Sequence, residues 1–296
     1  MNLPAFEWEA PRTLGEVSAR LAAEGDRARL IAGGTDLLVK MKRGGPRPQV
    51  LLSLQRVENL DRIHPASDGL RVGPLVTMAR LSKDPGIVAL WTALAEGAAV
   101  VGGPIIRNRA TIGGNIVNAR PCADTVPPLI VLGALLRLTG ASTERVVPAD
   151  GFVTGPGATA IHPDEILTAI ELPACSNGPA GSAYIKVTRR AAMEVTLVGC
   201  AAYVGLDPGR STIRKARLVF ASVGPTPVCA RQAETVLVGS AISAATIAAA
   251  GKAARAAVHP ITDHRAPADF RSEVVEVIAR RAILASIARA GGTVKS

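Results

Sequence analysis

The sequence predicts an α+β protein with two domains. Its 296 residues exceed the length of an average single domain. Over the first 176 residues, short apolar runs of strand length alternate with glycine-rich loops and helical patterns, whereas three longer strands and then two helices occupy the remainder. The turn-forming segment 174–181, which includes Asn177-Gly178-Pro179, marks the expected boundary between domains at 1–176 and 177–296.

Composition excludes several classes of protein. No charge-free run reaches the roughly eighteen apolar residues of a membrane span, and the first residues lack the segments of a signal peptide, so we expect a cytoplasmic protein without a transmembrane segment. Four cysteines occur, at positions 122, 175, 200 and 229. They form no CxxC pair, so we expect neither a metal site nor an iron–sulfur cluster within the chain.

Charge and aromatic content bear on possible partners. The formal net charge is +10, but Lys and Arg are spread along the chain and aromatic residues make up only 3%. Nucleic-acid binding proteins usually show clustered basic residues and aromatic side chains that stack on bases. The composition therefore favours a broad positive surface that meets an acidic protein or an anionic ligand.

The first elements lead into a glycine loop. Thr13 is a candidate N-cap for a helix whose apolar residues recur at helical spacing up to Gly25. A short strand, 29–32, then precedes the glycine loop Ala32-Gly33-Gly34-Thr35-Asp36, and a helix is expected to begin at Thr35 or Asp36. A strand, a double glycine and a helix can bind phosphate, because glycine lets the backbone approach and successive N–H groups converge. The motif alone is weak, because it is neither GxGxxG nor GxxxxGK and many such turns bind nothing, so a plain turn is the favoured interpretation of this loop in isolation.

Further strands and one long helix are expected before the next loop. Strands are predicted at 50–54, 70–76, 135–138, 145–147 and 166–173, and an alanine-rich helix at 85–100.

The second double glycine is the centre of the chain. Thr111-Ile112-Gly113-Gly114-Asn115 offers a hydroxyl and three backbone amides to an anion. Asp124 follows, three residues before a Pro-Pro pair that suits the first turn of a helix. Its carboxylate either caps that helix or accepts hydrogen bonds from sugar hydroxyls. We expect the two glycine loops to face each other across one diphosphate-bearing cofactor.

The second domain has a different pattern. Strands are predicted at 182–187, 195–206 and 213–223, with helices at about 241–257 and 269–290. A three-stranded antiparallel sheet backed by helices is typical of an α+β domain.

Together these segments resemble a known family, the FAD-binding medium subunits of molybdenum hydroxylases such as xanthine dehydrogenase and carbon monoxide dehydrogenase. The resemblance covers essentially the whole chain and is strongest in the following segments: AGGTDL at 32–37, IRNRATIGGNIVNA at 106–119, ADTVPPLIVLGA at 123–134, EILTAIELP at 165–173 and YIKVTRRAAMEVTLV at 184–198. DHRAPADFR at 263–271 and RRAIL at 280–284 also match. Ile105, where relatives commonly carry glutamine, Glu194, where aspartate is usual, and Gly199, where a polar residue is usual, depart from the pattern.

The resemblance implies an FAD-binding domain of the PCMH, or vanillyl-alcohol-oxidase, type with subdomains of about 1–55 and 56–176, followed by the C-terminal α+β domain. FAD is the implied cofactor of this chain. Matching positions give the implied cofactor-binding residues as Ala32, Gly33, Gly34, Thr35, Asp36, Thr111, Ile112, Gly113, Gly114, Asn115, Asp124, Leu167 and Lys186. No side chain is expected to act as an acid–base catalyst.

The implied function is electron transfer within an oxidoreductase complex. Partners implied by the family are a large subunit with the molybdopterin cofactor and a small subunit with two [2Fe–2S] clusters, arranged as a dimer of heterotrimers. Electrons from those clusters would reach FAD and then an external acceptor. Two alternatives remain at this point: a self-sufficient flavin-dependent oxidase, and a non-enzymatic basic protein that binds anions or nucleic acid.

Overall fold

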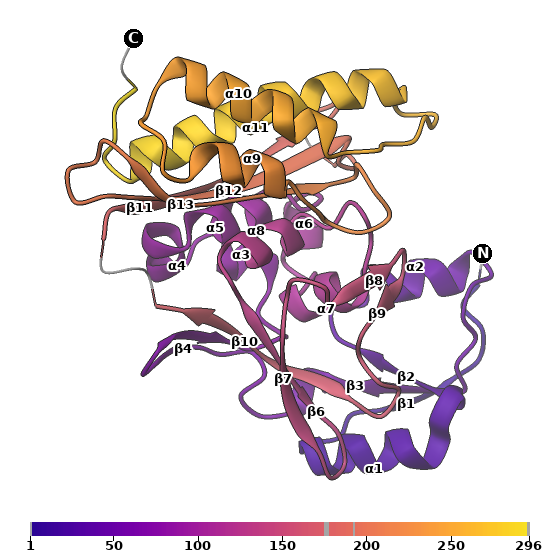
Figure 1. Ribbon diagram of the computed structural model, residues 1–296. Helices are drawn as coiled ribbons and strands as arrows, with labels where there is room; N and C mark the ends of the chain where they lie inside the picture. Colours follow the sequence, from indigo (N-terminus) through magenta and orange to yellow (C-terminus); the bar gives the residue numbers. More distant parts are fainter. Residues whose placement is uncertain (1, 175–177, 192, 295–296) are drawn as a thin grey trace.

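The computed structural model describes residues 2–174, 178–191 and 193–294. The expected boundary at 176/177 and Cys175 lie outside these residues. The strands form four sheets. In Figure 1 the C-terminal sheet lies in the upper half beneath α10 and α11, and the N-terminal and five-stranded sheets lie in the lower half. The mixed helix and strand fold predicted from the sequence is confirmed.

The N-terminal part is a small parallel sheet flanked by two helices. Its strands, in sheet order, are β1 (Glu7–Glu9), β3 (Val50–Ser53) and β2 (Ala28–Ile31). Helix α1 (Leu14–Glu24) begins as predicted at Thr13, whose hydroxyl accepts from the backbone N–H of Glu16. Helix α2 (Leu37–Lys42) leads from β2 towards β3, because parallel neighbours need a crossover connection.

A five-stranded antiparallel sheet follows. In sheet order its strands are β4 (Ile63–Ala66), β5 (Gly69–Val72), β10 (Ile166–Pro173), β6 (Leu135–Thr139) and β7 (Glu144–Pro148). A separate hairpin pairs β8 (Val153–Gly155) with β9 (Ala158–Thr159). Strand β10 has the predicted bounds and lies in the middle of the sheet, which explains its nearly continuous apolar sequence.

Short helices connect this sheet to the C-terminal part. They are α3 (Met78–Leu81), α4 (Pro85–Leu90), α5 (Thr92–Ala99), α6 (Pro104–Arg107), α7 (Ile112–Val117) and α8 (Val126–Val131). The single helix predicted over 85–100 is wrong, because it is interrupted at Trp91, whose φ and ψ are −119° and 47°. The Trp91 indole is buried and donates to the carbonyl oxygen of Pro173, 3.3 Å away, which fixes the interruption against the end of β10.

The C-terminal part is a sheet with helices on both faces. Its strands are β11 (Ala180–Val187), β12 (Val198–Leu206), β13 (Ile213–Ala221) and β14 (Val228–Cys229). Its own helices are α9 (Arg231–Leu237), α10 (Ala244–Ala256) and α11 (Ala268–Arg289). The sheet therefore has four strands where three were predicted, because β14 is too short to show a periodic pattern.

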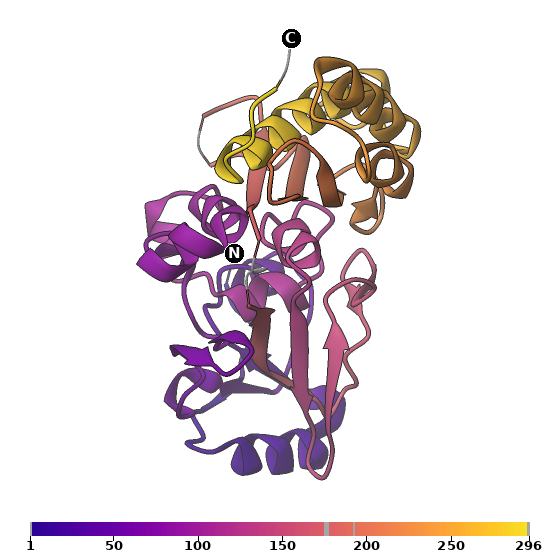
Figure 2. The same ribbon diagram turned by 60° about the vertical axis from the view of Figure 1, so that its left-hand side comes forward.

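The two parts share a hydrophobic core. Helices α9–α11 cover one face of the C-terminal sheet, and α5 and α8 pack on the other, as Figures 1 and 2 show. Tyr184, Ala201 and Val219 of this sheet belong to the same buried cluster as Leu94 and Leu129. Among the described residues, no helix is long and apolar enough to cross a membrane.

Candidate functional site

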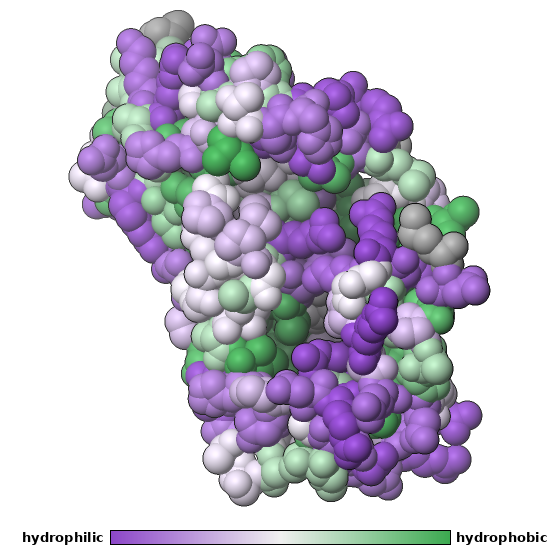
Figure 3. All heavy atoms as spheres, turned by 90° about the vertical axis from the view of Figure 1, so that its right-hand side faces the viewer, coloured by the Kyte–Doolittle hydropathy of each residue, from purple (hydrophilic) through white to green (hydrophobic). Residues whose placement is uncertain are grey.

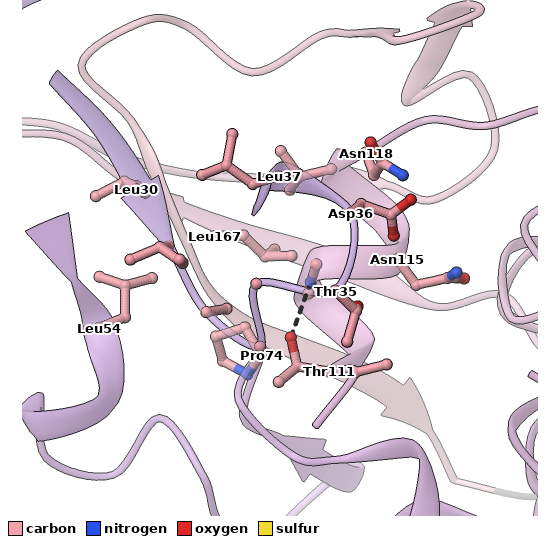
Figure 4. Close-up of a pocket in the computed structure, with 18 of the residues that line it drawn as sticks. Leu30, Thr35, Asp36, Leu37, Leu54, Pro74, Thr111, Asn115, Asn118 and Leu167 are labelled. Atoms are coloured by element: carbon pink, nitrogen blue, oxygen red, sulfur yellow. Dashed lines mark hydrogen bonds between the residues drawn. The ribbon is translucent and has the colours of Figure 1, made fainter. Parts of the chain in front are cut away.

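A cavity of about 550 Å³ lies where the two glycine loops meet. Its size falls within the roughly 300–1,000 Å³ typical of small-molecule sites. Figure 3 shows the molecular face that is hollowed between the upper and lower parts, with apolar residues inside the hollow. Figure 4 shows the lining, to which the two glycine loops contribute Asp36, Thr111 and Asn115 and β10 contributes Leu167.

The first glycine loop offers unused backbone donors. Within the described residues, the N–H groups of Gly33, Gly34, Thr35 and Asp36 make no hydrogen bond, and all four residues line the cavity. Gly34 has a φ of +74°, a conformation that glycine adopts at no steric cost. Consecutive amides without a protein acceptor form a concave site that suits an anion.

The second glycine loop uses its donors differently from what the sequence suggested. The N–H of Gly113 donates to Pro74 O at 2.9 Å, that of Asn115 to Thr111 O at 3.0 Å, and that of Gly114 to Thr111 Oγ1 at 3.1 Å. The last of these is the dashed line in Figure 4. The expectation that these three amides face an anion is therefore wrong, since they hold the N-terminus of α7 in place.

Two glycines allow close backbone contacts beside the cavity. A Cβ atom at Gly33 would lie 2.0 Å from the carbonyl oxygen of Arg109, and one at Gly113 would lie 2.5 Å from Cβ of Pro74. Neither backbone contact could persist with a larger residue. Gly33 thus lets the first loop lie against the backbone just before the second loop, and Gly113 lets the second loop lie against Pro74.

Polar side chains surround one end of the cavity. Lys40 Nζ donates to Asn118 Oδ1 at 2.5 Å. Arg120 Nε lies 3.5 Å from Asp36 Oδ1. Asn115 Oδ1 accepts from the Thr125 hydroxyl at 2.7 Å, which fixes the orientation of its amide. The Asp36 carboxylate therefore points to Arg120 at this rim.

Sequence reasoning missed Lys40, Asn118 and Arg120. Lys40 lies one helical turn after Asp36, and Asn118 lies three residues after Asn115, so helical periodicity places each on the face of a predicted site residue. This helical spacing could have identified Lys40 and Asn118 from the sequence.

Apolar side chains line the other part of the cavity. Leu167 projects from β10, and the lining also includes Leu30, Leu54, Val101 and Ile106. Such a surface suits a planar or otherwise apolar group, while the amides of the first loop suit a charged one.

Three of the predicted site residues do not line this cavity. Ile112 is fully buried in the core next to it. Asp124 and Lys186 are also absent from the lining and pair with each other, with Lys186 Nζ 2.8 Å from Asp124 Oδ2. Asp124 is not the cap of α8, because that helix begins after Thr125 without a side-chain cap.

The Asp124 carboxylate is enclosed by donors from the C-terminal part. Its Oδ1 accepts from the hydroxyls of Tyr184 and Thr196, each at 2.7 Å. Burial raises the pKa of Asp124 above its usual range, while Lys186 and the two hydroxyls act in the opposite direction by favouring the charged form. Burial is the main cause that raises the pKa of Tyr184 well above 10.0, and the negative charge of Asp124 is the second cause. The phenol therefore stays protonated and remains a hydrogen-bond donor.

A second ion pair supports the far wall of the cavity. The Arg145 guanidinium donates to both carboxylate oxygens of Glu165, at 2.6 and 2.8 Å, and to Ala160 O at 2.7 Å. Through these bonds Arg145 lowers the pKa of Glu165 from 4.5 to about 2. Ile161 and Ile166, next to the bonded residues, line the cavity.

Comparison with protein families gives two consecutive matches. The model described as the FAD binding domain in molybdopterin dehydrogenase matches residues 4–175. The model described as the CO dehydrogenase flavoprotein C-terminal domain matches residues 183–286.

Individual proteins agree with these matches. The xanthine dehydrogenase FAD-binding subunit of Escherichia coli O157:H7 is 34% identical over 273 residues, covering 92% of this chain and 93% of that protein. The carbon monoxide dehydrogenase medium chain of Hydrogenophaga pseudoflava is 33% identical over 286 residues, covering 97% of this chain and 98% of that protein. A solved structure of carbon monoxide dehydrogenase from that organism superposes with a TM-score of 0.93 at 34% identity, over 98% of this chain and 99% of that one. The structure of quinoline 2-oxidoreductase from Pseudomonas putida 86 superposes with a TM-score of 0.91 at 29% identity, over 98% of this chain and 99% of that one.

Proposed function

The chain belongs to the family of FAD-binding medium subunits of molybdenum hydroxylases, and on this premise we propose that it holds FAD between its two glycine loops and transfers electrons within such a complex. The matches confirm three predictions made from the sequence, namely the family, the FAD cofactor and the role as an oxidoreductase component. We propose, in addition, which residues hold FAD, how the electrons pass and how the subunits are arranged.

The observation that carries the proposal is the row of unused amides in the first loop. Gly33, Gly34, Thr35 and Asp36 present four consecutive N–H groups at the cavity, and the described residues supply no acceptor for them. A pyrophosphate group supplies such acceptors. The residues present therefore fit FAD.

The chain's other residues complete the site. The proposed roles of the second loop are to wall the cavity through Gly113 and Gly114 and to present the hydroxyl of Thr111 and the side-chain NH2 of Asn115. Leu167 and the other apolar lining residues would exclude water from the flavin ring of FAD. FAD, when bound, supplies two-electron redox chemistry, and the protein binds, orients and shields it.

Asp124 and Lys186 are proposed to act indirectly. Lys186 Nζ also donates to Val100 O at 3.1 Å, and the next residue, Val101, lines the cavity. Because the ion pair joins β11 to that wall, we assign both residues to positioning the wall and not to a direct contact with FAD.

The proposed partners are a large molybdopterin subunit and a small subunit with [2Fe–2S] clusters, assembled as a dimer of heterotrimers. Support comes from an exposed apolar patch outside the cavity wall, formed by Ile105 and Met193. Ile105 is 83% exposed although its neighbour Ile106 lines the cavity, and Met193 lies against Gly103. Exposed apolar patches of this kind mark protein interfaces.

We also propose that the chain divides into an FAD-binding domain, with subdomains of about 1–55 and 56–176, and a C-terminal domain of 177–296. The cytoplasmic location is likewise proposed, and the free thiols of Cys122, Cys200 and Cys229 support it.

A purified complex tests the proposal. The tagged chain would be isolated from the organism that produces it, and molybdenum, iron and FAD would be measured together. We expect all three with two further chains, and iron that is reduced before FAD on addition of limiting reductant. FAD without molybdenum or iron would contradict the proposed partners and leave the FAD assignment intact.

A further inference from the structure

Lys40 brings a positive charge to the flavin cavity that no carboxylate of the described structure balances. Its side chain is half-buried and lines the cavity together with the four residues of the first loop whose N–H groups are unused. Its Nζ donates to the neutral amide oxygen of Asn118, 2.5 Å away. Among the described residues, this nitrogen forms no ion pair. The Lys40 ammonium therefore has a hydrogen-bond acceptor but no counter-charge.

The other charged side chains of the lining are already matched. Arg29 donates to Asp26 O at 3.2 Å, and its guanidinium lies 3.9 Å from the Asp26 carboxylate. The Asp36 carboxylate lies 3.5 Å from Arg120 Nε, which offsets its charge. Lys40 thus supplies the positive charge that remains in the lining of the flavin cavity.

Helix α2 directs the Lys40 side chain towards the first loop. The backbone N–H of Lys40 donates to Asp36 O at 2.9 Å, so one helical turn separates the two residues. Helical side chains incline towards the N-terminus of their helix, so that of Lys40 covers the turn that begins at Asp36. In Figure 4, Asp36 and Asn118, the partner of Lys40, lie on the side of the cavity away from Leu30 and Leu54. The charge and the unused amides therefore belong to the same polar end of the cavity.

A diphosphate bound at this end needs such a charge. Each phosphate of FAD is negatively charged at neutral pH, whereas backbone amides donate hydrogen bonds without a net charge. An anion that leaves water for a partly enclosed cavity is stable there only if it is paired and hydrogen-bonded. Hydrogen bonds between an ionised donor and an ionised acceptor are roughly twice as strong as neutral ones. Amides and an ammonium together therefore bind a diphosphate better than amides alone.

We propose that Lys40 is the counter-charge of the FAD diphosphate and that Asn118 holds its side chain in the cavity. This inference rests on the proposed function and adds to it a cofactor-binding residue outside the two glycine loops. The alternative is a structural role, in which Lys40 only ties α2 to the end of α7 through Asn118. The two roles differ in how FAD binding responds to salt, because salt screens a charge and has little effect on a hydrogen bond to a neutral amide.

Fluorescence titration of the FAD-free full chain with FAD, at low and at high salt, tests the proposal. Lys40→Met keeps an apolar stem and removes the charge, so it should weaken FAD binding at least about tenfold at low salt. High salt should close much of this gap, because it screens the charge that only the unsubstituted chain carries. Lys40→Arg keeps the charge and should retain most of the affinity. Lys42→Met, at an exposed position of the same helix outside the cavity, should bind FAD like the unsubstituted chain.

Asn118→Ala separates the charge from the hydrogen bond. It removes the acceptor of Lys40 and leaves the ammonium in place, so it should weaken FAD binding less than Lys40→Met does and should keep the salt dependence. Equal losses in Asn118→Ala and Lys40→Met, with the same salt dependence in both, would show a structural link and overturn the proposal. It would also be overturned if Lys40→Met bound FAD as tightly as the unsubstituted chain. An unsubstituted, folded chain that binds no FAD would instead contradict the proposed function itself.

Discussion

Lys186 Nζ lies 2.8 Å from Asp124 Oδ2 and 3.1 Å from Val100 O, so one ammonium group joins the C-terminal sheet to two segments of the FAD-binding part. Side chains of both ionised residues are more than nine-tenths buried. Tyr184 and Thr196 complete the set of donors around the carboxylate. This arrangement makes the wall of the flavin cavity dependent on the packing of the C-terminal sheet.

Asp124→Asn should therefore lower the stability of the whole chain. Removal of one partner from a buried ion pair leaves the other charge uncompensated, at a cost on the order of 3 kcal/mol. Urea unfolding measures this change, and Asp26→Asn is the control because its carboxylate is fully exposed. If both substitutions leave the free energy of unfolding unchanged, the ion pair does not hold the two parts together.

Gly33→Ala should abolish FAD binding by the folded chain. The added Cβ would lie 2.0 Å from the Arg109 carbonyl oxygen, so the first loop must move away from the second. Gly15→Ala is a matched control, since nothing lies within 4 Å of that Cβ and alanine favours the helix. Fluorescence titration with FAD gives the affinity of each variant. Equal affinities would show that the close approach of the loops is not needed.

Lowering the pH should weaken the ion pair between Arg145 and Glu165, which supports one wall of the cavity. The pKa of Glu165 is lowered in the folded chain, from 4.5 to about 2, mainly by the hydrogen bonds from Arg145. A lowered folded-state pKa means that the stabilisation is present above about pH 4.5 and is lost as the pH falls towards 2. Its size is roughly 3 kcal/mol at most.

Unfolding measured at a series of pH values tests this dependence. Arg145→Gln should reduce the decline in stability below about pH 4.5, whereas Arg29→Gln, whose partner Asp26 is fully exposed, should leave it intact. Parallel curves for Arg145→Gln and the unsubstituted chain would contradict the assignment.

Ile105→Glu should reduce assembly with partner chains without loss of FAD. A charge at the centre of an apolar patch has to be desolvated in an interface, which costs several kcal/mol. Val277→Glu adds the same charge on α11, at a valine that is 45% exposed, and serves as the control. The amounts of co-purified chains and of FAD are compared. Equal assembly of both variants would exclude this patch as an interface.

Local signals were sufficient to predict most of the framework. The Thr13 N-cap, the apolar run of β10 and the double glycines each depend on neighbouring residues, and the structure has them where the sequence placed them. The interruption at Trp91 could not be predicted in this way, because its indole is held by Pro173, a residue far away in the chain.

Helix α11 shows a similar limit. The apolar Phe270, Val277 and Leu284 are 40–45% exposed, whereas the small residues Ala279 and Ala282 are buried. Apolar residues occur all around this helix, so periodicity alone could not select the buried face. Packing against β11 and β12 selects it.

Within the site, sequence could indicate residue types but not their partners. The family resemblance placed Asp124 and Lys186 at the cofactor, and spacing indicated neither that they pair with each other nor that Tyr184 and Thr196 join them. These contacts connect residues that lie 60 or more positions apart, a distance over which local patterns carry no information.

The flavin content of the purified chain tests the central claim most directly. The protein would be isolated, denatured, and the released pigment identified and quantified against the protein, before and after incubation of the folded chain with FAD. The account predicts one FAD per chain for the unsubstituted protein and for Gly15→Ala, and none for folded Gly33→Ala. A folded, unsubstituted chain that neither contains FAD nor takes it up would contradict the account.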